Sequence, residues 1–297
     1  MTDVADPGTT RAGFVALAGL PNAGKSTLLN ALLGRKLSIT APKPQTTRNR
    51  IVAVAAHGDS QLVFVDTPGI HHARGLMHRR MVEQARSSLG EADVSCWLIA
   101  ADKGIRRPDR EQLAALADKS TVIVLNKIDR VSKPSLLPIM AEIAEINPNA
   151  QCLPVSALRR QGIDDLTAVL ADLVPEGPWL YPSDVLTELP ARFFVAELVR
   201  EQLFRRLREE MPYRLAVVVD RFQERGGRTR IQATIYTDSP SSKKIIVGAG
   251  GEGVKTVGIE ARRGCERFLE TRVDLFLDVK VRKAWQEDER FLAELGI

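Results

Sequence analysis

The stretch GLPNAGKS, residues 19–26, decides the fold of this 297-residue chain. It has the form G-x-x-x-x-G-K-S, in which glycines let backbone N–H groups wrap closely around the phosphates of a nucleotide. An apolar run at 14–18 precedes it, as a buried strand would, and a helical pattern at 27–33 follows it. The N-terminus of such a helix favours anions. We therefore expect a phosphate-binding loop, in which Lys25 reaches the β- and γ-phosphates and Ser26 ligates Mg²⁺.

Apolar runs alternate with helical patterns from residue 13 to about residue 173. The alternation predicts an α/β fold, a mostly parallel sheet with helices on both faces. The runs at 51–55 and 62–65 are joined by a connection too short for a helical crossover, so we expect an antiparallel hairpin there. The other expected strands are 14–18, 94–100, 122–125 and 153–155, and the expected helices lie near 76–89, 108–118, 134–146 and 163–173.

The sequence D-T-P-G at 66–69 follows the expected strand at 62–65, at the end of the sheet where ligands bind in folds of this kind. Asp66 can hold Mg²⁺ through a water. The N–H of Gly69 can reach a γ-phosphate, and the glycine lets the following loop change shape when that phosphate leaves. D-x-P-G alone is a common turn, but at this distance after a phosphate-binding loop it predicts a second nucleotide-binding element.

The sequence N-K-I-D at 126–129 follows the strand at 122–125 and predicts which base is bound. The Asp129 carboxylate can accept hydrogen bonds from the ring N–H and the exocyclic amine of guanine together, whereas adenine has no such donor pair. Lys127 can pack its stem over the purine, and S-A-L at 156–158 would place backbone N–H groups on the guanine carbonyl. The expected nucleotide contacts are Gly19, Asn22, Ala23, Gly24, Lys25, Ser26, Thr27, Asn126, Lys127, Asp129, Ser156, Ala157 and Leu158.

Together these elements resemble the GTPase superfamily, whose G1, G3, G4 and G5 motifs occur here in sequence order. The resemblance implies GTP and GDP as ligands, with a G2 threonine between residues 34 and 50 that caps Mg²⁺ when GTP is bound. Thr46 and Thr47 both stand in this polar, proline-rich segment, and we favour Thr47. The expected Mg²⁺ ligands are Ser26, Thr47 and, through water, Asp66; the expected catalytic residues are Asn22, Lys25, Thr47 and Gly69.

Ile70 occupies the position after Gly69, where Ras-like GTPases carry a glutamine that orients the attacking water. Isoleucine cannot hydrogen-bond water, so we expect slow intrinsic hydrolysis of GTP or another way of positioning the water. GTPases with the loop G-x-P-N-x-G-K-S include members in which the asparagine helps to bind K⁺, and this cation supplies the charge otherwise given by an arginine finger. Asn22 stands at that position, and stiffening of the loop is an equally open role for it.

Prolines and a glycine near 175–183 interrupt the pattern, and we place the first domain at 12–176 and a linker at 177–190. The remainder reads as helix, strand, strand, helix, helix, strand, with G-A-G-G at 248–251 between the two middle helices. This α+β order resembles a type II KH domain, expected at 191–284 and followed by a tail at 285–297. The expected elements are 192–210, 215–219, 230–236, 241–247, 252–269 and 273–281.

A G-x-x-G turn in a KH domain lets the backbone of single-stranded RNA approach closely, and the groove beside it takes about four bases. The tetrapeptide alone is a weak signal because glycine-rich turns are common. Residues 192–283 carry 20 Lys and Arg against 13 Asp and Glu, so the basic excess of the chain lies here, although a solvated basic face is the other interpretation. The expected RNA contacts are Lys243, Lys244, Gly248, Ala249, Gly250, Gly251, Lys255 and Arg262.

The two halves together resemble one family, the Era GTPases, from about residue 12 to residue 287. The resemblance implies a GTP-switched factor that binds the 3′ end region of small-subunit ribosomal RNA and assists assembly of the small ribosomal subunit. It further implies peripheral contact with the inner face of the cell membrane. We expect a cytoplasmic monomer with no DNA partner. The stretches that carry it are GLPNAGKSTLLNALLG, PQTTRNRIVA, FVDTPGIH, VLNKID, PVSAL, REEMPYRLAVVVDRF, VGAGGEGVKTVGIEAR and VDLFLDVKVRKAW.

One position departs from that family. Era proteins usually carry a lysine at the first variable position of the G-x-x-G turn, and here the residue is Ala249. Loss of one phosphate contact lowers the affinity for RNA and flattens its salt dependence, so we expect RNA binding to persist but to be weaker. A KH-like half that binds protein or membrane instead of RNA is therefore one rival interpretation. A metabolic phosphotransferase is the other, and Asp129 argues against it.

The composition indicates the cellular compartment in which the protein works. Three widely separated cysteines, Cys96, Cys152 and Cys265, predict a reducing compartment and no disulfide framework or zinc site. The first residues carry no apolar run typical of a signal peptide, and no stretch approaches the ~20 apolar residues of a membrane span.

The two domains must communicate if the bound nucleotide controls the binding of RNA. We expect the change from GTP to GDP to be transmitted to the second domain through residues 176–188 and the loop after Gly69.

Overall fold

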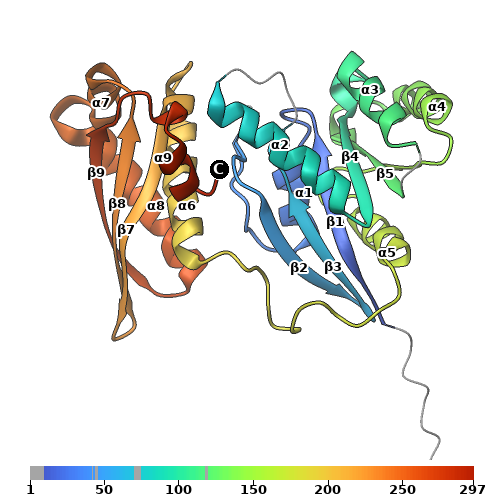
Figure 1. Cartoon of the computed structure of the whole chain (residues 1–297), viewed down its shortest axis with the longest axis horizontal. Coiled ribbons are helices and arrows are strands. Elements are labelled where there is room, and N and C mark those ends of the chain that lie inside the picture. The colour runs from blue at the N-terminus through green and yellow to red at the C-terminus, as the bar shows by residue number, and fades with distance from the viewer. Residues whose placement is uncertain (1–9, 42, 44–45, 70–74, 118–119) are drawn as a thin grey trace, which may run out of the picture. The chain divides into compact units, whose positions relative to one another are not determined.

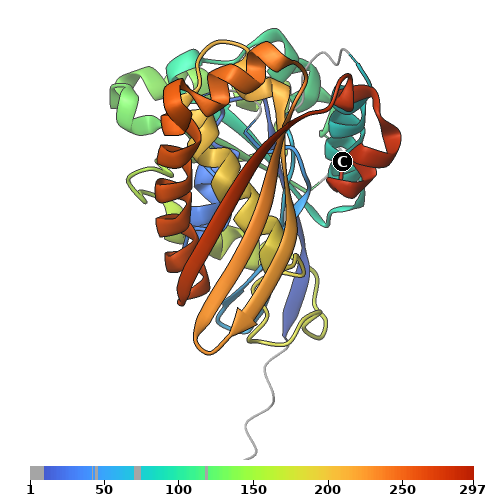
Figure 2. The same ribbon diagram turned by 90° about the vertical axis from the view of Figure 1, so that its left-hand side faces the viewer.

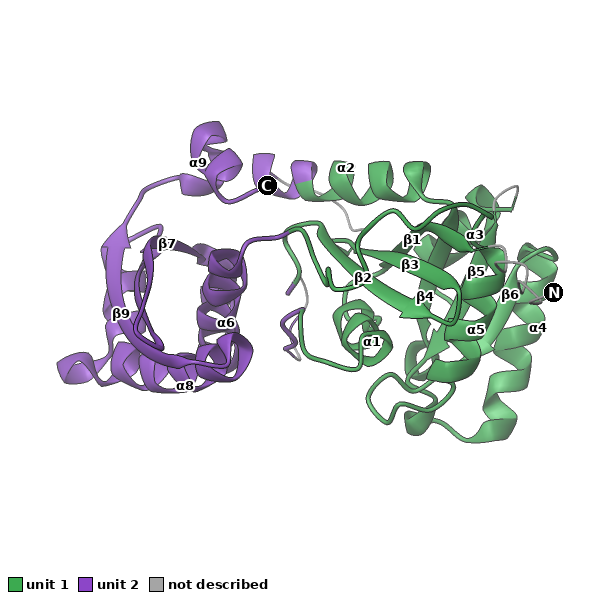
Figure 3. Cartoon of the chain, turned by 90° about the horizontal axis from the view of Figure 1, so that it is seen from below, with its two compact units in different colours: residues 1–37, 47–72, 81–188 green, residues 38–46, 73–80, 189–297 purple. Residues whose placement is uncertain are grey.

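The structure is a computed structural model, and it describes residues 10–41, 43, 46–69, 75–117 and 120–297. The chain divides into two compact units, which are described separately (Figure 3). Unit 1 consists of residues 1–37, 47–72 and 81–188, and unit 2 of residues 38–46, 73–80 and 189–297. Two short segments from the first half of the sequence therefore belong to unit 2.

Unit 1 is built on a six-stranded sheet of order β2-β3-β1-β4-β5-β6 (Figure 1). β2 and β3 pair antiparallel, and all other neighbouring strands pair parallel. The predicted hairpin and the predicted mostly parallel sheet are thus confirmed. The strands are β1 (Arg11–Gly19), β2 (Ile51–His57), β3 (Ser60–Asp66), β4 (Val94–Ala100), β5 (Thr121–Asn126) and β6 (Gln151–Pro154).

Helices cover both faces of this sheet, as the alternation predicted. Ala85, Leu113 and Ile143, from three successive helices, pack with Trp97 and Ile123 of the sheet in one buried cluster. Figure 3 shows α1 and α5 on the opposite side of the sheet from α2. The helices are α1 (Lys25–Leu32), α2 (Leu76–Glu91), α3 (Arg107–Ala115), α4 (Leu136–Ile146) and α5 (Ile163–Leu173).

The segment after α5 runs back along β2 and β3 of unit 1. Gln61 donates from its side-chain amide to the carbonyl of Tyr181 at 2.7 Å and accepts from the N–H groups of Leu180 and Tyr181. The indole of Trp179 donates to the carbonyl of Asp59. These side-chain and backbone bonds hold the segment on the sheet edge, so it is not a freely moving tether.

Among its described residues, unit 2 contains a three-stranded sheet of order β7-β8-β9, the helices α6 to α9 and the first residues of α2 (Figures 1 and 2). β7 and β8 pair antiparallel around a turn in which Gly226 and Gly227 both have positive φ, and β8 and β9 pair parallel. The predicted order of elements is confirmed. The elements are α6 (Ala191–Arg206), β7 (Leu215–Arg225), β8 (Arg228–Thr237), α7 (Pro240–Val247), α8 (Glu252–Leu269), β9 (Arg272–Val281) and α9 (Glu289–Glu294).

Three details of unit 2 differ from the expectation. β7 runs to Arg225, whereas the expected strand ended at residue 219. α6 ends at Arg206 and not at 210, because Leu207 is extended and a separate 3₁₀ turn forms at Met211–Arg214. The C-terminal segment carries a helix, α9, that the sequence did not predict. Its residue Phe291 is buried and its ring packs edge-on against Tyr236 and Trp285.

No helix among the described residues is long and apolar enough to cross a membrane.

Candidate nucleotide site and RNA interface

The phosphate-binding loop leaves the end of β1 and enters α1 directly. Gly19, Asn22 and Gly24 take positive φ angles in it, and a Cβ on Gly24 would lie 2.3 Å from the side-chain nitrogen of Asn126. Lys25 is buried at 6% exposure, and its amine donates to the carbonyls of Gly19 at 3.1 Å and Leu20 at 3.4 Å. Burial lowers the pKa of Lys25 to about 8, against the opposing charge of Asp66. The loop thus presents a buried cation at the N-terminus of a helix, a setting that attracts phosphate.

Three oxygen ligands meet beside this loop. The hydroxyls of Ser26 and Thr47 lie 2.6 Å apart, and Ser26 donates to an Asp66 carboxylate oxygen at 3.1 Å. Thr47 reaches the same oxygen at 3.4 Å. Thr46 does not join them, because its hydroxyl donates to the carbonyl of Lys43. One carboxylate and two hydroxyls are too few ligands for a dedicated metal cage but suit Mg²⁺, which takes its remaining ligands from water and substrate phosphates.

The N-K-I-D motif at the end of β5 forms hydrogen bonds to the phosphate loop. Asn126 is buried; its amide donates to the carbonyl of Ala23 at 2.9 Å, and its carbonyl oxygen accepts from the N–H groups of Lys127 and Ala157. The amine of Lys127 donates to the carbonyl of Asn22 at 2.5 Å. The motif therefore ties three loops together, so Asn126 has a role in positioning them that the sequence interpretation did not assign.

Ser156 orients the carboxylate expected to read the base. Its hydroxyl donates to Asp129 at 2.5 Å and accepts from the N–H of Arg159. Ala157 is buried, whereas Leu158 is 72% exposed. The backbone of this loop is thereby fixed next to Asp129.

The D-T-P-G element turns away from β3 over the phosphate loop. The Thr67 hydroxyl donates to the carbonyl of Leu17 on β1. A Cβ on Gly69 would lie 3.1 Å from three atoms of Pro21, so this position has little room for a side chain. Ile70, expected to replace the water-orienting glutamine, lies outside the described residues.

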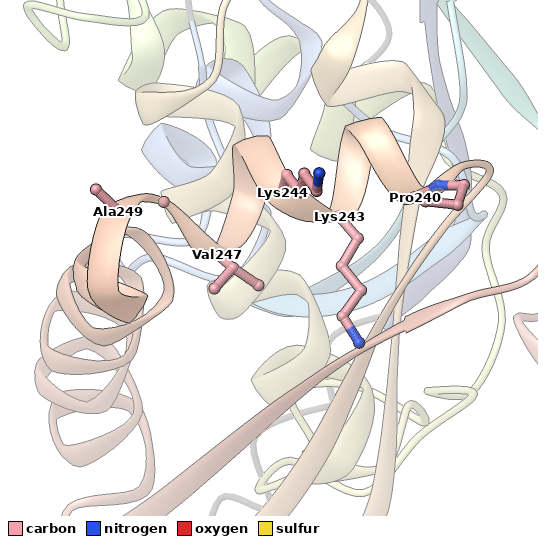
Figure 4. Close-up of a pocket in the computed structure, with 6 residues that line it drawn as sticks. Pro240, Lys243, Lys244, Val247 and Ala249 are labelled. Atoms are coloured by element: carbon pink, nitrogen blue, oxygen red, sulfur yellow. The ribbon is translucent and has the colours of Figure 1, made fainter.

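Unit 2 has two hollows lined by residues of the G-x-x-G turn and its neighbouring elements. The first, of about 520 Å³, lies on α7, and Figure 4 shows Lys243 extending away from that helix beside it. Gly248, Gly250 and Gly251 have positive φ in the turn. The first hollow is lined by Pro240, Lys243, Lys244, Val247, Gly248 and Ala249.

The second hollow is a groove of about 320 Å³ between α8 and β9. Its walls combine apolar side chains with two cations, Lys255 and Arg262. The predicted RNA contacts therefore divide between the two hollows, and Gly250 and Gly251 belong to the lining of neither. The groove is lined by Val254, Lys255, Gly258, Ile259, Arg262, Leu275 and Leu277.

The sequence interpretation missed the apolar part of this groove. Ile259 is 40% exposed on α8, an unusual place for a large apolar side chain. Leu275 and Leu277 alternate along β9, which is the signal that could have placed both on one face. Apolar walls with basic rims suit the flat faces of bases and the phosphates that join them.

Comparison with known proteins identifies the family. Residues 14–127 match the sequence model described as 50S ribosome-binding GTPase, and residues 210–286 match that of the KH domain. GTPase Era of Nitratidesulfovibrio vulgaris strain DP4 is 44% identical over 300 residues, covering 97% of both chains. GTPase Era of Geotalea daltonii is 46% identical, covering 96% of this chain and 97% of its own. The chain belongs to the Era family of GTPases.

Solved Era structures share both units. A single-residue variant of Era from Aquifex aeolicus, bound to GDP and AlF₄⁻, is 36% identical with a TM-score of 0.92, over 97% of this chain and 99% of that chain. An Era complex with MgGDPNP and nucleotides 1506–1542 of 16S ribosomal RNA has a TM-score of 0.93, 36% identity and the same coverage. The predicted fold, a Ras-like GTPase domain followed by a KH domain, is therefore confirmed.

Proposed function

We propose that this Era GTPase is a GTP-hydrolysing switch that binds small-subunit ribosomal RNA near its 3′ end and assists assembly of the small ribosomal subunit. The observation that carries the proposal is the meeting of Lys25, Ser26, Thr47 and Asp66 at one end of a sheet, in a chain that also holds a G-x-x-G turn beside a groove with basic rims. The Era complex with GDPNP and 16S ribosomal RNA supports it.

At the nucleotide, each group has a distinct task. The loop N–H groups and Lys25 hold the phosphates, and Ser26, Thr47 and, through water, Asp66 hold Mg²⁺. Bound Mg²⁺ supplies neutralisation of the charge that develops on the phosphate oxygens during hydrolysis. The N–H of Gly69 holds the γ-phosphate, so the loop that follows this glycine senses whether that phosphate is present.

Selection of guanine falls to Asp129. Its carboxylate, oriented by Ser156, accepts from the ring N–H and the exocyclic amine of the base. We expect Asp129→Asn to lower GTP affinity by at least about a hundredfold and to favour xanthosine triphosphate, whose 2-carbonyl can accept from an amide. Asp172→Asn, an exposed change on α5, is the control. Retained GTP preference over ATP in Asp129→Asn would refute this role for Asp129.

We also propose that K⁺ assists hydrolysis at Asn22. The Lys127 contact uses the backbone carbonyl of Asn22, so it does not depend on the asparagine side chain. The positive φ of Asn22 supports the other role, since asparagine tolerates this conformation and would stiffen the loop. A hydrolysis rate that is equal in K⁺ and Na⁺ would exclude the cation role and leave the conformational one.

RNA binding is proposed for the groove between α8 and β9 and for the turn beside it. Gly258 lines the groove, and a Cβ there would meet only Leu277 at 3.6 Å, so a side chain can enter without displacing the backbone. Gly258→Glu should weaken binding of a single-stranded RNA from the small-subunit 3′ end, whereas Gly90→Glu, an exposed change on α2, should not. If neither the native protein nor the control binds RNA while GTP binding is intact, the KH unit serves a protein or membrane partner.

The cellular location and the oligomeric state of the protein are further parts of the proposal. We propose a cytoplasmic monomer with peripheral contact to the inner face of the cell membrane, the basic excess of residues 192–283 supporting attraction to anionic lipid. Sedimentation with anionic and neutral vesicles tests the membrane contact, and sedimentation velocity tests the monomer. Equal binding to both vesicle types, or none, would contradict an electrostatic contact.

A further inference from the structure

Two short turns leave neighbouring strands of the sheet in unit 1. The 3₁₀ turn Ala101–Lys103 follows β4, and the 3₁₀ turn Ile128–Arg130 follows β5. β4 and β5 pair in parallel with Ala100 opposite Asn126, so both turns begin at the same level of the sheet. The second turn carries Asp129, the carboxylate expected to read the base. All these residues belong to unit 1.

Asp102, in the first turn, is joined to the second turn by an ion pair. One of its carboxylate oxygens accepts from the Arg130 guanidinium at 3.3 Å. The side chain of Asp102 is 17% exposed, and its other oxygen is buried without a hydrogen-bond partner among the described residues. The negative charge of Asp102 is thus balanced by the cations around it and not by further hydrogen bonds of its own.

Lys127 is the second cation on which Asp102 acts. Burial lowers the pKa of Lys127, and the charge of Asp102 raises it. The remaining charges that act on this amine are cations and lower its pKa; they are Arg130, Lys103 and Arg106. Among these charges Asp102 alone is negative, so it offsets the repulsion between Lys127 and the other cations.

Lys127 and Arg130 flank Asp129 and fix its turn. Lys127 has a φ of 65°, a left-handed conformation that a residue other than glycine keeps only where its surroundings support it. The carbonyl of Lys127 accepts from the N–H of Arg130 at 3.0 Å, which closes the turn around Asp129. The amine of Lys127 donates to the carbonyl of Asn22 in the phosphate loop. A displacement of either flank would therefore move the carboxylate of Asp129.

We propose that Asp102 is a positioning residue for guanine recognition: by holding Arg130 and Lys127, it fixes the carboxylate of Asp129 relative to the base. The inference rests on the proposed role of Asp129 in selecting guanine. Asp102 acts through the residues on either side of Asp129 and not through a contact of its own with the nucleotide. Its loss should therefore affect discrimination between bases more than binding of phosphates.

The test compares the affinities of the full-length protein for GDP and for inosine diphosphate, which lacks the exocyclic amine of guanine and keeps the ring N–H. Asp102→Asn keeps the shape of the side chain and removes its charge. It should lower the preference for GDP over inosine diphosphate about fivefold, the upper range for loss of a partly exposed ion pair. Arg130→Gln should act in the same direction. Asp172→Asn, an exposed change on α5, is the matched control and should leave the preference unchanged.

The double variant Asp102→Asn/Arg130→Gln shows whether the two residues act through one contact. Its loss of preference for GDP should be smaller than the product of the two single losses, because the second change removes an interaction that the first has already broken. A loss equal to that product would overturn the inference, since residues that act independently have effects that multiply.

Asp129→Asn separates this inference from the function on which it rests. A loss of the GDP preference in Asp129→Asn with none in Asp102→Asn overturns the inference alone. No loss in Asp129→Asn overturns the role of Asp129 and the inference with it. Equal weakening of GDP and inosine diphosphate in Asp102→Asn also overturns the inference, because a merely structural role would not distinguish the two bases.

Discussion

Asn126 links three loops that are far apart in the sequence. One buried amide holds the carbonyl of Ala23 in the phosphate loop and accepts from the N–H groups of Lys127 and Ala157. These hydrogen bonds join the phosphate loop to the loops that follow β5 and β6. The side chain therefore contributes to the site by holding these loops in position, as well as through any contact with the base.

We expect Asn126→Ala to weaken binding of GDP and GTP alike, by about tenfold or more. The change leaves buried backbone groups without partners, at a cost of about 1–3 kcal/mol each. Calorimetric titration with both nucleotides measures the effect, and the exposed change Asn149→Ala is the control. A loss of affinity confined to GTP would contradict this explanation, because the hydrogen bonds of Asn126 hold loops that both nucleotides would contact and do not involve the γ-phosphate.

At the scale of elements, two glycines of α8 have opposite surroundings. A Cβ on Gly253 would lie 2.5 Å from the carbonyl oxygen of Ile246 and 2.8 Å from that of Val247. A Cβ on Gly258 would make an ordinary contact at 3.6 Å. The first glycine lets α7 and α8 meet closely at the G-x-x-G turn, and the second leaves the groove open.

Gly253→Ala should therefore lower the free energy of unfolding by about 1–3 kcal/mol, because backbone atoms of α7 cannot move aside cheaply. Gly258→Ala should raise it by up to about 1 kcal/mol, since alanine is the better helix former. Urea unfolding followed by circular dichroism compares them. Equal effects of the two changes would show that α7 and α8 are not packed as described.

A substitution in the G-x-x-G turn should raise the affinity for RNA. Ala249 is exposed and lines the first hollow, next to Lys243 and Lys244. Ala249→Lys should tighten RNA binding and steepen the slope of log affinity against log salt by about 0.7, the value for one more phosphate contact on a single strand. Ala293→Lys adds the same charge at an exposed position of α9 and should leave the slope nearly unchanged. An equal gain in both variants would mean general attraction and no contact at the turn.

At the scale of the molecule, the features that the sequence predicted correctly are those determined by residues close together in the chain. GLPNAGKS sets its own strand, turn and helix, and the motifs at 66–69 and 126–129 follow buried strands that bring them to one sheet end. The sequence favoured Thr47 over Thr46 without a local reason, because the distinction depends on which hydroxyl lies beside Ser26 and Asp66. The apolar wall of the groove between α8 and β9 likewise depends on how these two elements pack together, which no local sequence pattern specifies.

α9 could not be predicted for a related reason. It has six residues, too few for a helix that is stable by itself. Asp288 caps it by accepting from the N–H of Phe291, and Arg282 donates to the same carboxylate group at 2.6 Å. The buried rings of Trp285 and Phe291 complete it. The helix is thus stabilised by contacts with the rest of unit 2, among them the packing of Phe291 against Tyr236.

In the proposed function, the nucleotide state of the first unit controls the affinity of the chain for RNA. We would test this by measuring the affinity of the full-length protein for single-stranded RNA from the small-subunit 3′ end, with a GTP analogue and with GDP, at two salt concentrations. We predict tighter binding with the analogue, by about 5- to 150-fold, and an affinity that falls as salt rises. Equal RNA affinity in the two nucleotide states, with each nucleotide shown to be bound, would contradict this coupling.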